Sequence, residues 1–348
     1  MGALWFWIVS LMLVAYVVLD GFDLGVGIIY LFVARTELER VQAMRAIGPV
    51  WDGNEVWLLA SGGTLFFAFP MLYASSFSGF YLPLMIVLWL LMLRGVSIEL
   101  RHHVTDKLWH SFFDSLFFFS STMLAIFFGA ALANVVRGVP IGPDGYFFLP
   151  LWTDWLTGPK PGILDWYTVL GGVLAFVALA MHGAFYLATK ATGALEARTC
   201  MLATRLTIAV GVLTLLSLPA TVIARLDSLH NYEEHPVAFL APIAVFAGLA
   251  IAWFAQRRGA QMTAFLGSCL YIAAMLAGAA AGLYPVLLPN VSPQGHDITV
   301  ANSLAGPHTL SVGLVWWTLG IILALFYFAV VYWLFRGKIS DDVTGYGH

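Results

Sequence analysis

The chain has 348 residues, of which 61% are hydrophobic and only 10% are charged. So few charged side chains cannot cover a water-exposed surface of this size, which excludes a soluble globular protein. The formal net charge of −3 is too small to indicate a nucleic-acid partner. The composition therefore predicts an integral membrane protein.

Long apolar segments follow one another along the whole chain. Runs of about eighteen or more mostly apolar residues are long enough to cross a bilayer as helices. The first run is too long for a signal peptide and lacks a cleavage pattern, so we expect it to remain as an anchor. We expect one all-α polytopic membrane domain, 1–348, with nine transmembrane helices at 5–34, 49–71, 79–101, 112–137, 164–190, 201–224, 237–255, 261–284 and 309–335.

The positive charges favour one orientation of these helices. If the N-terminus lies outside, the cytoplasmic side holds thirteen of the sixteen Lys and Arg residues, and the outer side holds only Arg137, Lys160 and Arg225. Cytoplasmic loops of membrane proteins carry an excess of Lys and Arg. The sequence therefore predicts a periplasmic N-terminus and a cytoplasmic C-terminus.

Short cytoplasmic connections suggest that sequential helices pack antiparallel in bundles. We expect residues 1–137 to form a first four-helix bundle, 164–284 a second one, and 309–335 a peripheral helix. The segment Met181–Phe185 has the same position in the fifth predicted helix as Leu19–Asp23 has in the first. This echo is consistent with a duplication, although apolar helices also resemble one another by chance.

Two acids lie near the middle of the first predicted helix. Asp20 and Asp23 are three residues apart, so they share one helical face, and each is about fifteen residues from either end of its segment. An Asp at that depth costs about 2.5–3.5 kcal/mol on insertion, and intramembrane acids usually carry protons or ions. Gly21 and Gly25 would let a neighbouring helix approach closely and shelter both acids.

Further charges extend this polar face toward the cytoplasm. Asp52 and Glu55 begin the second predicted helix, Arg94, Glu99 and Arg101 end the third, and Asp114 begins the fourth. Together with Asp20 and Asp23, these residues predict a series of polar side chains within 1–137 that runs from the cytoplasm to the middle of the membrane. However, the helix dipole also stabilises acids near helix N-termini, and Arg94 could simply neutralise Asp20. We favour this structural interpretation for Glu99, Arg101 and Asp114, and a functional one for Asp20, Asp23 and Asp52.

Histidine and cysteine do not indicate a cofactor site in this chain. A bis-histidine haem needs two imidazoles at matching depth, and only His182 lies well inside a predicted helix. Cys200 and Cys269 have no metal-binding spacing, so we expect free thiols and no bound metal.

Four motifs follow one another in the first third of the chain. They are Leu19–Gly27, Trp51–Trp57, Gly62–Pro70, and Arg94–Gly95 with Glu99 and Arg101. In this order they resemble the motifs of a known family, subunit II of the bacterial cytochrome bd quinol oxidases. The nine-helix plan extends the resemblance to the whole chain, and the sequences of the motifs look closer to the cyanide-insensitive branch.

The resemblance implies a heterodimer in the bacterial cytoplasmic membrane. Subunit I would carry the quinol site, two haems b and one haem d, while this subunit would carry no haem. The complex would reduce O2 to water with electrons from quinol, taking protons from the cytoplasm without pumping. A small single-helix third subunit and a structural quinone or lipid in this subunit are also compatible with the family.

The resemblance also implies roles for individual residues. Asp20 and Asp52 match acids of a proton route, whereas Asp23 and Arg94 match residues that retain haem at the subunit contact, with Glu99 in support. Relatives vary between Glu and Gln at the position of Glu55.

Two other functions are compatible with the charged residues. A proton-coupled secondary transporter also places paired acids at a repeat interface, but here the second half has only His182 in their place. A structural scaffold would leave the cost of burying Asp20 unexplained.

Overall fold

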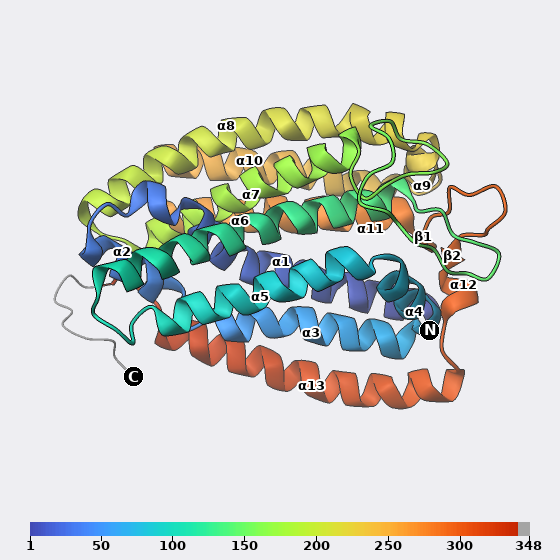
Figure 1. Cartoon of the computed structure of the whole chain (residues 1–348), viewed down its shortest axis with the longest axis horizontal. Coiled ribbons are helices and arrows are strands. Elements are labelled where there is room, and N and C mark those ends of the chain that lie inside the picture. Colours follow the sequence, from blue (N-terminus) through green and yellow to red (C-terminus); the bar gives the residue numbers. More distant parts are fainter. Residues whose placement is uncertain (340–348) are drawn as a thin grey trace.

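The structure is a computed structural model that describes residues 1–339, apart from the side chains of Leu226 and Ser228. Its long helices lie side by side along one axis, and short elements cap the ends (Figure 1). The helices are α1 (Gly2–Val33), α2 (Glu37–Ile47), α3 (Trp51–Ala68), α4 (Pro70–Gly79), α5 (Tyr81–Leu100), α6 (Lys107–Arg137), α7 (Trp166–Lys190), α8 (Gly193–Ala224), α9 (His230–Glu234), α10 (Leu240–Arg257), α11 (Gln261–Leu283), α12 (Val300–Ser303) and α13 (Pro307–Leu334). Two 3₁₀ turns, Leu226–Leu229 and Pro236–Phe239, and an antiparallel pair of short strands, β1 (Val286–Leu288) and β2 (Ile298–Thr299), complete the described chain.

Eight helices within residues 1–339 are long and apolar enough to cross a membrane. Each coincides with one of the predicted segments. The segment predicted at 49–71 instead forms α3 and the start of α4, and α3, with 18 residues, is long enough but not apolar enough to be counted among the eight. Its first turns contain Asp52, Asn54 and Glu55, which lower its mean hydropathy. A polytopic all-α membrane protein is therefore confirmed, whereas nine spans and the orientation stay predictions.

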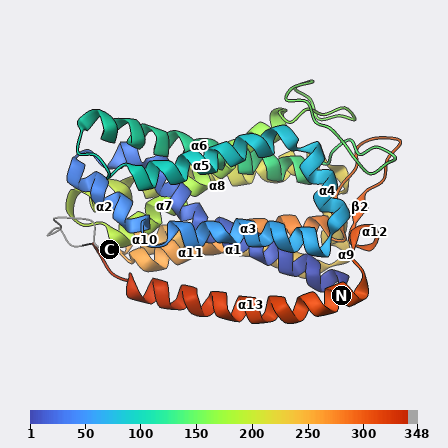
Figure 2. The ribbon, with the colours of Figure 1, turned by 60° about the horizontal axis from the view of Figure 1, so that its bottom comes forward.

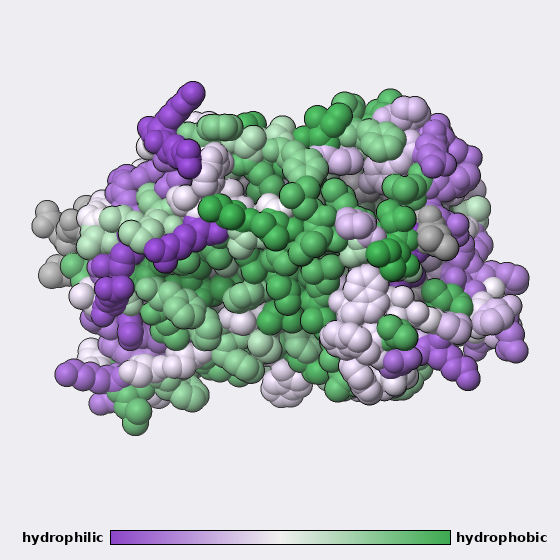
Figure 3. All heavy atoms as spheres, turned by 90° about the horizontal axis from the view of Figure 1, so that it is seen from above, coloured by the Kyte–Doolittle hydropathy of each residue, from purple (hydrophilic) through white to green (hydrophobic). Residues whose placement is uncertain are grey.

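The surface has the polarity expected of a protein embedded in lipid. Hydrophobic residues gather across the middle of the face in Figure 3, and hydrophilic residues gather toward its two ends. The apolar side chains in the middle of this face would contact lipid hydrocarbon and not water. Helices suit such surroundings because their backbone N–H and C=O groups form hydrogen bonds with one another.

Helix α1 is central to the packing. It contacts α3, α6, α7 and α11, and every residue from Asp20 to Tyr30 is buried. Helix α13 lies on the outside of the bundle (Figure 2). The most apolar 18 consecutive residues of α13 include no buried residue. The two proposed four-helix bundles share an apolar core to which α1 and α7 both contribute.

Small residues let α1 and α7 approach closely. A Cβ added at Gly25 would lie only 2.6 Å from the backbone nitrogen of Gly183, and one added at Gly21 would lie 2.9 Å from a methyl group of Leu179. Real Cβ atoms essentially never lie within 3.0 Å of such atoms, so α7 is the neighbour that Gly21 and Gly25 admit, through a side chain at Gly21 and through the backbone at Gly25.

Polar contacts fix the helix ends. Helix α2 begins with a capping box in which Thr36 and Glu39 satisfy each other's backbone groups. At the other end of the bundle, Asp165 caps α7 and pairs with Arg137, the last residue of α6. These contacts hold the connections against the transmembrane helices.

Candidate functional site

Asp20 and Arg94 form a fully buried ion pair between α1 and α5. The Arg94 Nη1 and Nη2 groups donate to the two Asp20 carboxylate oxygens at 2.8 and 2.5 Å, and both side chains are 0% exposed. Two parallel hydrogen bonds match the planar guanidinium to the carboxylate. Each ion depends on the other, because an unpaired charge in this apolar interior would carry a large desolvation penalty.

Asp23 has a different set of partners. Its Oδ2 accepts a hydrogen bond from the Asn54 side chain at 2.7 Å, and the Asn54 Oδ1 accepts one from the Tyr332 hydroxyl at 2.9 Å. The Asn54 amide also lies 3.3 Å from the carbonyl oxygen of Leu19. This hydrogen-bonded chain connects α1, α3 and α13 beside the Asp20–Arg94 pair.

Two buried polar atoms of this cluster have no hydrogen-bond partner within the described chain, Asp23 Oδ1 and Arg94 Nε. Tyr16 and Asp23 both interact electrostatically with Asp20 and Arg94, so these groups share one neighbourhood. Buried polar atoms are rarely left unpaired in native proteins, so this cluster has hydrogen-bonding capacity that the described chain does not use.

Glu55 lies between the buried pair and the exposed Asp52. Its Oε2 is 3.9 Å from Arg94 Nη1, its side chain is 22% exposed, and it interacts electrostatically with Arg94, Asp20 and Asp52. Asp52 is exposed, and its carboxylate accepts a hydrogen bond from the Gly53 backbone N–H at 2.6 Å. The three acids thus become more buried from Asp52 through Glu55 to Asp20.

The structure brings together only some of the predicted site residues. Asp20, Asp23 and Arg94 form one cluster, and Asp52 reaches it through Glu55. Glu99 is exposed on α5, where its backbone carbonyl lies 3.1 Å from the His103 ring.

Three members of the cluster were not selected from the sequence. Asn54 stands in the motif of Asp52 and could have been noticed there. Tyr16 and Tyr332 carry no charge, and Tyr332 is 278 positions from its partner Asn54, so no local pattern indicates either of them.

A second charged cluster surrounds Asp114 and includes Glu37. The Asp114 carboxylate accepts hydrogen bonds from Tyr30 at 2.6 Å, Arg101 at 2.5 Å and Arg40 at 2.8 Å. Arg101 also reaches Glu37 at 3.0 Å. This network joins α2 to α1, α5 and α6, which agrees with the structural interpretation of Arg101 and Asp114.

His182 does not fit a haem ligand. Its Nδ1 lies 2.8 Å from the Ser268 hydroxyl and its Nε2 lies 2.9 Å from the carbonyl oxygen of Val18. Because a carbonyl only accepts, Nε2 carries the proton and donates it to α1. Both nitrogens are therefore engaged, and no group of three or more His, Cys, Asp or Glu residues within 1–339 could hold a metal ion. Cys200 and Cys269 are free thiols.

Comparisons with known proteins give a consistent result over nearly the whole chain. Residues 1–335 match the family described as "Cytochrome bd terminal oxidase subunit II". The chain is 28% identical to "Cytochrome bd-I ubiquinol oxidase subunit 2" of Escherichia coli K12 over 366 residues, covering 97% of this chain and 95% of the relative. It is 30% identical to "Cytochrome bd ubiquinol oxidase subunit 2" of Bacillus subtilis over 309 residues, covering 89% and 88%.

A solved structure shares the fold. A chain in the bd oxidase structure from Geobacillus thermodenitrificans superimposes with a TM-score of 0.76 at 16% identity, covering 96% of this chain and 98% of the other. At that identity the likeness concerns the arrangement of helices alone.

Proposed function

Because the chain belongs to the cytochrome bd terminal oxidase subunit II family, we propose that it is a haem-free subunit that stabilises subunit I and delivers cytoplasmic protons to it. Family membership makes the chain part of a terminal quinol oxidase, and its apolar helices are those of a multi-pass protein of the bacterial inner membrane. The haems would reside in subunit I, as the engagement of both His182 nitrogens supports. The complex would reduce O2 to water without pumping protons, and this chain would not be catalytic alone.

The observation that supports proton delivery most strongly is the graded burial of three acids. Asp52 is exposed, Glu55 is 22% exposed, and Asp20 is 0% exposed. Burial of a charge costs free energy, so a protein keeps such a series only where the charges have a task or are fully paired. We assign Asp52 to proton entry, Glu55 to transfer, and Asp20 to the buried end of the route.

Arg94 is shared among the acids of this cluster. It donates two hydrogen bonds to Asp20 and interacts electrostatically with Asp23 and Glu55. A change of charge on any one of these acids would therefore change the electrostatic field at the other two.

Asp23, Arg94 and Glu99 would also support haem retention at the contact with subunit I. Asn54 of α3 donates a hydrogen bond to Asp23, and Asp20 of α1 forms an ion pair with Arg94. A change at the subunit contact would therefore be transmitted to helices deep in this chain. The alternative, a proton-coupled transporter, is disfavoured because the family match covers residues 1–335 and describes an oxidase subunit.

The experiment measures O2 consumption and the visible haem spectrum of the purified complex with Asp20→Asn and Asp52→Asn. Each substitution keeps the side-chain size but removes the proton-carrying group. We expect turnover to fall by about tenfold, equivalent to about 1.4 kcal/mol in the barrier, with haem content retained in Asp52→Asn. Turnover of Asp20→Asn is measured per d haem, because this variant leaves Arg94 buried without its ion partner. The exposed Glu233→Gln is the control at another helix. Unchanged turnover in both Asp variants would refute the proton route.

A further inference from the structure

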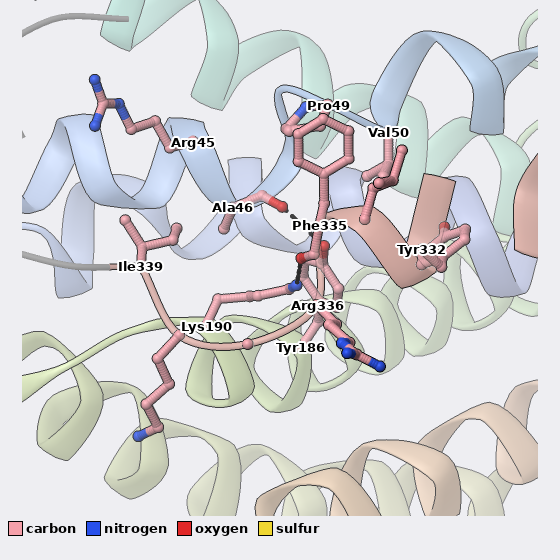
Figure 4. A pocket seen from close by; sticks show the side chains of 13 residues that line it. Arg45, Ala46, Pro49, Val50, Tyr186, Lys190, Tyr332, Phe335, Arg336 and Ile339 are labelled. Carbon is pink, nitrogen blue, oxygen red and sulfur yellow. Dashed lines mark hydrogen bonds between the residues drawn. The ribbon is translucent and has the colours of Figure 1, made fainter. Parts of the chain in front are cut away.

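A cavity of about 230 Å³ lies where the end of α7 meets the α2–α3 connection and the segment after α13 (Figure 4). None of its lining residues is acidic, and four are basic. The basic residues are Arg45, Lys190, Arg336 and Lys338. A concave site with this charge is suited to an anion.

Two of the four cations, Lys190 and Arg336, have no carboxylate partner within the described chain. Lys338 pairs with Glu196 at 2.5 Å. The Lys190 Nζ donates to the Phe335 carbonyl oxygen at 2.6 Å, which uses one of its three protons (Figure 4). Within residues 1–339, no carboxylate forms a salt bridge with Lys190 or Arg336. Arg336 stacks on the Trp333 ring with 5.1 Å between its guanidinium carbon and the ring centroid.

The position of the cavity points to a lipid headgroup. It lies at the ends of two apolar helices, and the neighbouring side chains of Trp333 and Phe335 are 59% and 51% exposed. Aromatic side chains of this kind favour the interface between hydrocarbon and water. The charge distribution of the sequence predicts the cytoplasm at this end, where anionic lipids attract basic pockets between transmembrane helices.

We propose that this cavity binds the phosphodiester headgroup of an anionic phospholipid, with Lys190 and Arg336 as its main ligands. The volume equals that of about eight water molecules of ~30 Å³ each, which is enough for a phosphate and its glycerol carbons. Figure 4 shows Arg45 extending away from Lys190, so Arg45 contributes at the edge. The acyl chains would cover part of α13, whose most apolar window has no buried residue.

A bound headgroup would add to the hydrogen bonds that already connect three elements. Lys190 belongs to α7, Arg336 follows α13, and Arg45 lies in the last turn of α2. The lipid would thus anchor the peripheral helix at its cytoplasmic end. This role is independent of the proposed proton route.

The test is native mass spectrometry of the purified complex with subunit I, titrated with phosphatidylglycerol. Each removed cation is expected to weaken binding about fivefold, so Lys190→Gln with Arg336→Gln together should weaken it about 25-fold. The control is Arg258→Gln, which removes one exposed cation at the α10–α11 turn, outside the cavity lining. Phosphatidylcholine tests whether the headgroup must be anionic.

Retention of phosphatidylglycerol by the double variant at the wild-type level would overturn the proposal. Equal binding of phosphatidylcholine, or full competition by inorganic phosphate at millimolar concentration, would overturn the assignment to an anionic lipid. The thermal unfolding midpoint in phosphatidylcholine nanodiscs identifies a variant that is merely misfolded. In that case the single Lys190→Gln variant, which retains Arg336, decides the question with its expected fivefold loss.

Discussion

Gly25 of α1 and Gly183 of α7 touch backbone to backbone in the interior of the bundle. A Cβ at Gly183 would lie 2.5 Å from the Gly25 Cα, and a Cβ at Gly25 would lie 2.8 Å from the Gly183 Cα. Asp23 is two residues from Gly25 and His182 is next to Gly183. The close crossing therefore determines the positions of the polar groups on both helices.

Gly183→Ala is expected to destabilise the complex by about 3 kcal/mol, the upper end of the usual cost of overpacking. The cost is high because the new methyl group would meet the backbone of α1, which cannot move aside as a side chain can. The measurement is the thermal unfolding midpoint in detergent. Gly211→Ala is the matched control, since nothing lies within 4 Å of a Cβ added there on α8. An equal midpoint for the two variants would contradict the crossing.

Arg94→Leu is expected to be more harmful than the loss of the whole pair. It leaves Asp20 charged and buried without its partner, which typically costs about 3–5 kcal/mol. We expect depletion of the d-haem band or dissociation of subunit I, measured by visible spectroscopy and size-exclusion chromatography. The double variant Asp20→Asn with Arg94→Leu should partly restore both, because no orphaned carboxylate remains. A full haem spectrum in Arg94→Leu would rule out a role in retention.

Glu39 predicts a pH dependence at the cytoplasmic helix α2. Burial opposes ionisation, but hydrogen bonds from Arg198 and from the backbone N–H groups of Arg35 and Thr36 lower the pKa of Glu39 below its ordinary value of 4.5. A carboxyl with a lowered pKa stabilises the folded state above pH 4.5 and loses that effect as the pH falls through the folded value.

Glu39→Gln should therefore destabilise α2 at pH 7, and the difference from wild type should begin to shrink only below pH 4.5, as Glu39 becomes protonated. Hydrogen exchange of the α2 amides at pH 7 and at a series of pH values below 4.5 measures this. Glutamine can still complete the capping box with Thr36, so the variant isolates the charged contact with Arg198. A difference between wild type and variant that did not shrink at any of these lower pH values would disprove the pH dependence.

Tyr332→Phe is expected to loosen the end of α13. The substitution leaves Asn54 Oδ1 without the 2.9 Å hydrogen bond from Tyr332 and should cost about 1–3 kcal/mol. Limited proteolysis after α13 would report the loosening, and the turnover of the complex would report any effect on Asp23. Tyr327→Phe, on the same helix and 48% exposed, is the control. Identical cleavage rates in the two variants would show that the contact is not needed.

Much of the fold follows from the sequence because lipid imposes a simple requirement of length and hydropathy. The predicted segments coincide with the helices over most of their lengths. The starts are less accurate: 201–224 becomes α8 from Gly193, and 112–137 becomes α6 from Lys107. In both cases the first turns are polar and extend past the apolar segment, so hydropathy does not detect them.

The site is predictable only where its residues are conspicuous. Asp20, Asp23 and Arg94 stand out because charges are rare in apolar segments, and the structure groups them. Asn54 and Tyr332 contribute through a contact between distant helices, which depends on how α3 and α13 pack. The exposure of Glu99 and Asp52 also depends on packing, because a helical face is exposed or buried only in relation to its neighbours.

The lengths of the longest helices set where the polar networks lie in the bilayer. Helices α1 and α8 have 32 residues and α6 has 31, so each is about 46–48 Å long. The hydrocarbon layer is about 30 Å thick, and even a 40° tilt reduces the projected length only to about 36 Å. These helices must protrude beyond the hydrocarbon. Asp114 lies two turns into α6, so the protrusion brings its network close to the headgroup zone although Asp114 itself is buried.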